Sequence, residues 1–183
     1  MIEELLPPVV QCVESRQDVP DPVLFPVEAA QVAGAVDTRR REYATVRHCA
    51  RQALAALGLP PVPLPRGERG APCWPDGVVG SLTHCDGYRA AAVARASALA
   101  SVGIDAEPHA PLPDGVLSLV ARPEEQSQLA TLAARHPEVA WDRLLFCAKE
   151  AIYKAWYPLA RRFLDFSEAT VTLTPDEIGR AHV

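Results

Sequence analysis

The sequence predicts an α+β protein in which helices pack on small antiparallel sheets, and three observations favour that class. A strongly amphipathic helical pattern runs from about Thr38 to Leu57. Apolar, β-like segments follow between residues 78 and 107, with a hairpin signal between the first two. Two further helical patterns then occupy most of residues 123–159. This order of elements is typical of an α+β fold.

The N-terminal part is rich in proline and weakly patterned, so we expect only a short strand at Val9–Glu14 and a short helix at Val27–Ala33. The long helix that follows should be capped by Asp37 and closed by Gly58. Its buried stripe is expected to comprise Tyr43, Val46, Ala50, Leu54 and Leu57.

Proline and glycine residues predict a loop over residues 60–77, ahead of three strands at Val78–His84, Tyr88–Arg95 and Leu99–Glu107. Asp86–Gly87 is a hairpin turn signal between the first two strands. The C-terminal part should contain one more strand and three helices, at Ala169–Thr174 and at Val116–Val120, Pro123–Arg135 and Pro137–Leu159.

The composition is that of an ordinary globular protein of 183 residues, with 49% hydrophobic and 22% charged residues. Its net charge of −5 argues against a nucleic-acid or anionic-membrane partner, because both require a basic surface. The five cysteines are odd in number and form no Cys-x-x-Cys pair, so we expect free thiols. The start, MIEELLPPVV, carries acids where a secretory signal carries lysine or arginine, and we expect a cytoplasmic protein.

Two carboxylates end the apolar run ALASVGIDAE. If residues 99–107 form a strand, Asp105 and Glu107 project from the same face and repel each other unless a cation lies between them. Glu150 on the last helix would add a third oxygen donor, and three carboxylates suit magnesium. Taken alone, the i,i+4 pair Glu150 and Lys154 is more typical of a solvated helix surface.

The long helix concentrates arginine in an otherwise acidic protein, at positions 39, 40, 41, 47 and 51. Arg40, Arg47 and Arg51 fall on one stripe, which predicts either a solvated basic face or a site for phosphate. Arg66 and Arg69 in the next loop would extend such a site. His84 ends a strand, where a lone histidine is more often structural than functional.

Four blocks in order resemble one family, the Sfp-type 4′-phosphopantetheinyl transferases, and in particular their actinobacterial and enterobactin-type branch. The blocks are RRREYATVRHCARQAL, GAPCWPDGVVGSLTHCDGY, SVGIDAEPH and WDRLLFCAKEAIYKAWYP. The resemblance implies two pseudo-symmetric α/β subdomains with coenzyme A and magnesium between them. It also implies transfer of 4′-phosphopantetheine to a serine of an apo acyl or peptidyl carrier protein, which leaves adenosine 3′,5′-bisphosphate.

By this resemblance, the magnesium carboxylates are Asp105, Glu107 and Glu150, with Glu150 also the base for the carrier serine. The residues that bind coenzyme A are Arg39, Arg47, Arg66, His84 and Lys149, with His84 on the 3′-phosphate. Lys154 would neutralise or protonate the leaving phosphate. The alignment of the motif favours Arg39 as the partner of Arg47, whereas helical spacing favours Arg40, and both remain open at this point.

The resemblance places the N-terminal subdomain at residues 1–106 and the C-terminal one at 107–183. We expect the second subdomain to be truncated and interpret residues 177–183, EIGRAHV, as non-native sequence. We also expect a monomer. Two other functions compete with the transferase: a magnesium-dependent nucleotide phosphohydrolase that uses the same carboxylates, and an inactive coenzyme A-binding remnant.

Overall fold

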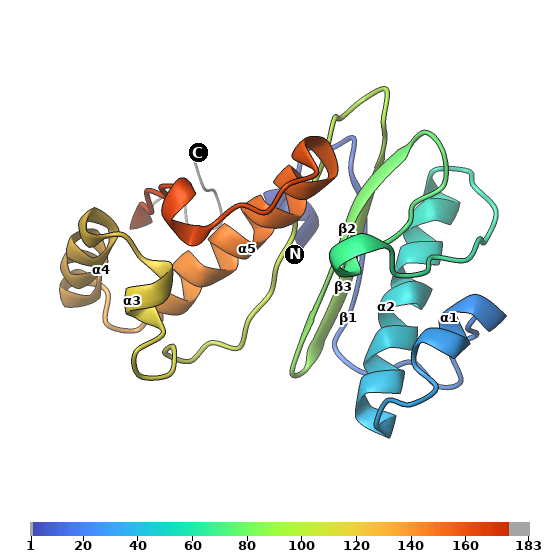
Figure 1. Cartoon of the computed structure of the whole chain (residues 1–183), viewed down its shortest axis with the longest axis horizontal. Coiled ribbons are helices and arrows are strands. Elements are labelled where there is room, and N and C mark those ends of the chain that lie inside the picture. Colours follow the sequence, from blue (N-terminus) through green and yellow to red (C-terminus); the bar gives the residue numbers. More distant parts are fainter. Residues whose placement is uncertain (1, 176–183) are drawn as a thin grey trace.

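The structure is a computed structural model, which describes residues 2–175, and Figure 1 shows its two halves side by side. One half is a sheet with helices on it, and the other consists of helices. The helices of the first half are η1 (Ile2–Leu5), α1 (Pro26–Gln31), α2 (Asp37–Ala56) and η2 (Glu68–Gly70), and its strands are β1 (Gln11–Ser15), β2 (Val78–Cys85) and β3 (Tyr88–Arg95). The second half contains α3 (Leu117–Val120), α4 (Pro123–Arg135), α5 (Trp141–Ala160) and η3 (Phe166–Glu168).

The described strands form one antiparallel sheet in the order β1-β3-β2, so β3 is central and β2 is an edge. The hairpin turns at Asp86–Gly87, as predicted, and Gly87 takes the positive φ of 70° that the turn requires. Five consecutive residues of β3, Ala90–Ala94, are fully buried, because both faces of the sheet are covered.

Helix α2 covers one face of the sheet, and its core joins Ala50, Ala53 and Leu54 to Ala91 and Val93 of β3 (Figure 1). Other residues cover the opposite face: η1 contributes Ile2, and the segment after β3 contributes Val102 and Ile104. A separate core in the second half packs α4 against α5, around Leu129, Leu132, Trp141 and Leu145.

The α+β class and most predicted elements are confirmed, and α4 has the predicted bounds. The cap predicted at Asp37 is wrong: Val36 is the N-cap, without a side-chain cap, and Asp37 lies in the first turn, paired with Arg40. The predicted subdomain boundary at residue 106 stays a prediction, and residues 177–183 lie outside the described residues.

The strand predicted at Leu99–Glu107 is not formed, although the segment lies along the sheet. Side chains of β2 take the place of a backbone ladder. The Ile104 amide donates to the Ser81 hydroxyl at 3.1 Å, and the Ala106 amide donates to the Thr83 hydroxyl at 2.9 Å. An apolar pattern therefore predicted the burial of this segment correctly but its hydrogen bonding wrongly.

The strand predicted at Ala169–Thr174 is also absent from the described elements. The alternating pattern nevertheless predicts burial correctly, because Ala169, Val171 and Leu173 are buried. The Val171 amide donates to the Glu125 carboxylate at 2.8 Å, and the Leu173 amide to the Gln128 side chain at 3.1 Å. Side chains of α4 thus bind backbone groups that a neighbouring strand would otherwise bind.

Gly103 lets α5 approach the segment between the two halves. A Cβ there would lie 1.9 Å from the Ala151 carbonyl oxygen and 2.7 Å from the Ala155 nitrogen, both backbone atoms of α5. The Ser101 hydroxyl donates to the Ala155 carbonyl at 2.7 Å, which fixes the same contact. Among the described residues, no helix is long and apolar enough to span a bilayer.

We expect Gly103→Ala to lower the free energy of unfolding by about 3 kcal/mol, because the added methyl group overlaps backbone that cannot move alone. Urea unfolding followed by circular dichroism measures the change. Gly34→Ala is the matched control, since nothing lies within 4 Å of a Cβ at that position. Equal stability of the two variants would contradict this account of the junction.

Candidate active site

A cleft of about 740 Å³ lies along the exposed edge of the sheet, between the two halves of the molecule. It is lined by α2, by the loop of residues 66–74, by the edge strand β2 and by α5. Its volume is in the range of ordinary ligand sites. Six of the predicted site residues line this cleft: Arg39, Arg47, Arg66, His84, Glu150 and Lys154.

The first turns of α2 bring Arg39 to the end of β2, where its guanidinium contacts the His84 Nε2. Glu42 lies one turn further along α2, with its carboxylate 3.5 Å from Arg39 and 3.7 Å from His84. Arg40, the alternative to Arg39, instead pairs with Asp37 at the exposed start of the helix. Of the two candidates, Arg39 is therefore the one that lines the cleft.

His84 lies in an environment that favours the neutral imidazole. Burial lowers its pKa, and the nearby Arg39 guanidinium lowers it further, while Glu42 opposes both effects. A phosphate group bound beside His84 would offset the positive charge of Arg39. Protonation of the imidazole should then become easier.

Arg47 and Arg66 approach the cleft from α2 and from the following loop. Both guanidinium groups lie over the Tyr43 ring, at 3.5 Å and 4.8 Å from its centroid. Arg47 is nearly buried, and its Nε donates to the Leu64 carbonyl at 3.2 Å. Burial lowers the pKa of Arg47 to about 10, so the group still carries its charge at neutral pH.

The predicted stripe of Arg40, Arg47 and Arg51 does not act as a unit. Arg51 donates to the fully buried Glu28 at 2.9 Å, which ties α2 to α1. Arg69, in contrast, lines the cleft with Arg66, as the loop position suggested. The cationic surface of the cleft therefore comes from two elements rather than from one helix face.

Asp105 and Lys154 form an ion pair at the α5 side of the cleft, with 2.6 Å between the Asp105 Oδ1 and the Lys154 Nζ. The Thr83 hydroxyl donates to the same Oδ1 at 3.2 Å. The other oxygen, Oδ2, is buried and has no hydrogen-bond partner. Lys154 thus pairs with Asp105 and not with Glu150, its i,i+4 neighbour.

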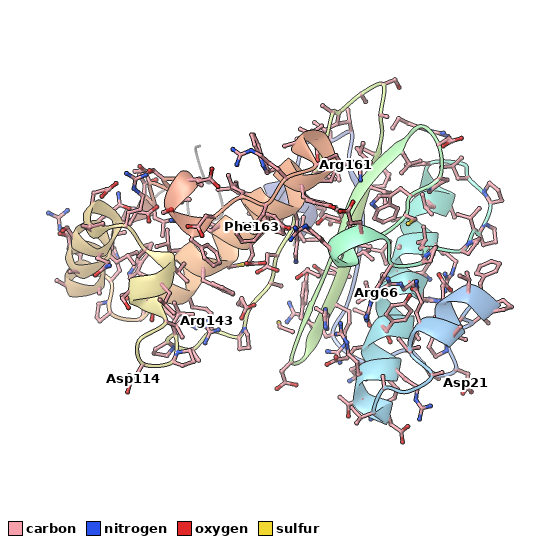
Figure 2. All side chains as sticks on the ribbon, in the orientation of Figure 1. Asp21, Arg66, Asp114, Arg143, Arg161 and Phe163 are labelled. Carbon is pink, nitrogen blue, oxygen red and sulfur yellow. The ribbon has the colours of Figure 1, made fainter. Side chains whose placement is uncertain are left out.

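Glu107 is held by a residue that the motifs did not single out. The Arg143 guanidinium donates to the Glu107 carboxylate at 3.1 Å and to the backbone carbonyls of Ala110 and Pro111 at 3.1 Å and 2.9 Å. Figure 2 labels Arg143 in the half formed by α3–α5, and Arg66 beside α2. Asp105 and Glu107 are therefore neutralised separately, each by a cation of α5.

Glu150 faces the cleft from the middle of α5. Burial raises its pKa, and the nearby carboxylates of Asp105 and Glu107 also raise it, while Lys154 lowers it. The three carboxylates predicted to hold a metal are thus close enough to interact electrostatically. Among the residues that the structure describes, however, no three acidic, histidine or cysteine side chains form a ready metal site.

The donor set nevertheless suits a hard divalent cation. The free Oδ2 of Asp105 is a buried oxygen that needs a partner, and a cation would supply one. Glu150 presents a second carboxylate that is costly to ionise without a nearby positive charge. Glu107 would join this pair only by exchanging or sharing its contact with Arg143.

Lys149, which the motif predicts to contact phosphate, does not line the cleft in this structure. Its side chain is 1% exposed and its Nζ donates to three acceptors: Glu125 at 2.7 Å, the Val120 carbonyl at 3.0 Å and the Phe166 carbonyl at 2.8 Å. An ammonium has three protons, so none remains for a ligand. Lys149 therefore joins α5 to α4 and to the segment around η3.

Sequence reasoning missed Glu42, Tyr43, Arg143 and Glu125 as members or supports of the site. Tyr43 belongs to the buried stripe of its helix, as predicted. Its ring also stacks on an arginine, which the helical pattern does not indicate. Glu125 carries a sequence signal, because an acid three residues after a helix start is typical of a capping box. Its carboxylate accepts from the Arg122 amide at 2.7 Å.

Taken together, a cleft lined by arginines, a histidine, a lysine and Glu150, with Asp105 paired to that lysine, suits a protein that binds a phosphorylated ligand and transfers a phosphorylated group. Comparison with known proteins identifies the family. Residues 27–94 match the 4′-phosphopantetheinyl transferase N-terminal domain, and residues 101–182 match the 4′-phosphopantetheinyl transferase superfamily.

Related proteins support the same assignment. The chain is 62% identical over 179 residues to the 4′-phosphopantetheinyl transferase Svp of Streptomyces mobaraensis, covering 96% of this chain and 73% of that protein. It is 53% identical to PptT of Mycobacterium tuberculosis, covering 91% and 72%. It is 32% identical to enterobactin synthase component D of Salmonella typhimurium, covering 64% and 48%. The chain belongs to the 4′-phosphopantetheinyl transferases, enzymes that transfer 4′-phosphopantetheine from coenzyme A to carrier proteins.

The raised pKa of Glu150 predicts a pH-dependent stability of the metal-free protein. The folded state binds this proton more tightly than the unfolded state, so the stability it contributes is present at low pH and is lost as pH rises through the raised pKa. Glu150→Gln cannot ionise and should therefore raise the melting temperature in EDTA at pH 7. That gain should disappear near pH 4.

Differential scanning fluorimetry across this pH range measures the effect. Glu138→Gln is the control, because the Glu138 side chain is 68% exposed. An unchanged melting temperature for Glu150→Gln at pH 7 would show that Glu150 carries no electrostatic strain in the folded state.

Proposed function

We propose that this chain transfers 4′-phosphopantetheine from coenzyme A to a serine of an apo acyl or peptidyl carrier protein and releases adenosine 3′,5′-bisphosphate. The observation that carries the proposal is a single cleft lined by Arg39, Arg47, Arg66 and His84 from one half and by Glu150 and Lys154 from the other. Coenzyme A has phosphate at both ends of its nucleotide, which suits a cleft with cations spread along its length.

In this proposal, the 3′-phosphate of coenzyme A lies against Arg39 and His84. The contact between Arg39 and His84 supports this placement, because two side chains that lie together can both bind the same phosphate. Arg47 and Arg66 bind the next phosphate groups of the ligand. Lys149 takes no part in binding, since its three protons are already donated within the protein.

Magnesium is the metal we propose for the acidic end, held by Asp105, Glu107 and Glu150. The buried Oδ2 of Asp105 and the raised pKa of Glu150 support this assignment. When bound, the ion would neutralise charge on the diphosphate oxygens. Lys154, which pairs with Asp105 in this structure, lines the same cleft and is placed to neutralise phosphate.

The reaction forms a bond from the carrier serine Oγ to the β-phosphorus of coenzyme A and breaks the bond from that phosphorus to the bridging oxygen. Glu150, directly or through a water molecule, accepts the serine proton. Lys154 stabilises or protonates the leaving phosphate. The remaining residues position and neutralise, as is general for phosphoryl transfer.

The two competing functions are less well supported. A nucleotide phosphohydrolase would release phosphopantetheine without a carrier protein, and a binding remnant would bind coenzyme A without turnover. Relatives that cover most of this chain are named as transferases, which favours transfer over both. The pathway of the carrier protein, the monomeric state and a cytoplasmic location stay predictions.

The transferase activity is tested by mass spectrometry of apo-carrier proteins after incubation with coenzyme A and magnesium. We expect the mass increment of phosphopantetheine with the wild type. Asp105→Asn should lower the rate at least a hundredfold while most of the coenzyme A affinity remains, because the cations at the other end are unchanged. Asp114→Asn, in an exposed loop, is the control.

Normal turnover of Asp105→Asn at low magnesium would show that this carboxylate does not serve a metal. Release of phosphopantetheine without any carrier would favour the phosphohydrolase instead.

The 3′-phosphate site is tested by comparing coenzyme A with its 3′-dephospho analogue. The wild type should bind coenzyme A more tightly, and Arg39→Met should reduce that preference about tenfold through loss of a charged hydrogen bond. Arg40→Met is the matched control, because Arg40 pairs with Asp37 away from the cleft. Calorimetry that gives equal affinities of the wild type for the two ligands would contradict the role of Arg39 and His84.

A further inference from the structure

Tyr43 holds two arginines of the cleft without taking away their charge. The ring is 2% exposed, and the guanidinium carbons of Arg47 and Arg66 lie 3.5 Å and 4.8 Å from its centroid. An aromatic face attracts a cation through its quadrupole but carries no net charge. A carboxylate in the same place would hold the guanidiniums more strongly and would also compete with any anion.

The other arginines of α2 are held by carboxylates. Each has a carboxylate partner within 4.0 Å: Arg39 with Glu42, Arg40 with Asp37, Arg41 with Asp18 and Arg51 with Glu28. No carboxylate in the described part of the chain lies within ion-pair distance of Arg47 or Arg66, although the more distant charge of Glu28 raises the pKa of Arg47. The two arginines that share the Tyr43 ring therefore differ from the other arginines of α2, because an aromatic ring holds them in place of a paired carboxylate.

Keeping these two cations close together has a cost. The charge of Arg66 lowers the pKa of Arg47, because like charges repel. Without an attractive surface, Arg66, which is half-buried and lies further from the ring than Arg47, would turn away into solvent. The Tyr43 ring offsets that repulsion and keeps both groups facing the cleft that they line.

The ring itself is fixed by Gln31 of α1. The Tyr43 hydroxyl donates to the Gln31 Oε1 at 2.9 Å, and the same oxygen accepts the Arg66 amide at 2.7 Å. The Gln31 amide group donates back to the Arg66 carbonyl at 3.0 Å. One glutamine thus sets both the ring and the backbone of the arginine that stacks on it.

We propose that Tyr43 is a positioning residue for phosphate binding: its ring holds Arg47 and Arg66 as a preformed pair of cations, neither of them ion-paired with a carboxylate, for the phosphate groups of coenzyme A. It acts through the two arginines and does not itself touch the ligand's phosphorus. The assignment rests on the proposed function, because coenzyme A is the ligand that the pair would receive.

Calorimetric binding of coenzyme A to two variants separates the ring from the hydroxyl. Tyr43→Phe keeps the ring and loses the hydroxyl with its bond to Gln31, so we expect affinity within about twofold of the wild type. Tyr43→Met keeps an apolar side chain but removes the ring, and we expect affinity to fall about tenfold. Recovery by phenylalanine and not by methionine is the expected signature of stacking.

A double-mutant cycle with Arg66→Met then distinguishes positioning from general loss of packing. If Tyr43 acts through Arg66, the cost of Tyr43→Met should be at least threefold smaller once Arg66 is removed. Costs that multiply independently would contradict the proposal, because a packing defect would act regardless of Arg66. Thermal unfolding of each variant checks that it is folded.

A measurement on the folded wild type covers the case in which Tyr43→Met does not fold. In protein carrying ¹³C-labelled tyrosine, the Tyr43 ring signals, assigned by their loss in Tyr43→Phe, should shift when coenzyme A is added. The shift should be smaller in Arg66→Met. Ring signals that do not respond to coenzyme A would overturn the proposal.

The outcomes also separate this inference from the proposed function. A wild type that binds no coenzyme A would remove the proposed function and this role with it. A wild type that binds coenzyme A, together with a folded Tyr43→Met variant of equal affinity, would remove only the role of Tyr43.

Discussion

The close contact of α5 with the segment after β3 is the constraint on which the site depends. At Gly103 the helix backbone approaches a chain that itself lies against the sheet, with no side chain between them. This contact brings Glu150 and Lys154 to the edge strand β2, opposite the cations of α2. Because β2 is an edge strand, its end and its backbone carbonyls remain accessible, and Lys154 reaches the Leu82 carbonyl at 3.3 Å.

Charge in the cleft is organised by pairing some groups and leaving others unpaired. At the acidic end, Lys154 and Arg143 reduce the repulsion that adjacent carboxylates would otherwise suffer. At the cationic end, the uncharged ring of Tyr43 stabilises Arg47 and Arg66. The acidic end can therefore exist before a metal is bound, while Arg47 and Arg66 have no paired carboxylate to compete with an anion.

Sequence patterns predicted the helices, the hairpin and the composition of the cleft, since these follow from local periodicity and from residue type. They failed where hydrogen bonds come from side chains. Residues 99–107 have the pattern of a strand, yet the hydroxyls of Ser81 and Thr83 accept the amides of two of these residues, Ile104 and Ala106. Lys149 and Lys154 look equivalent in the motif, and only the packing of α4 against α5 makes Lys149 a buried partner of Glu125.

The small buried residues of β3 give evolution a way to change this cleft from inside the protein. Ala90–Ala94 lie at the centre of the molecule, with α2 on one side and the segment that carries Asp105 on the other. Four of these five residues are alanine and the other is Val93, so α2 and that segment both pack close to the sheet. A single larger residue among these five would widen the cleft from within and alter its selectivity, with every lining side chain left intact.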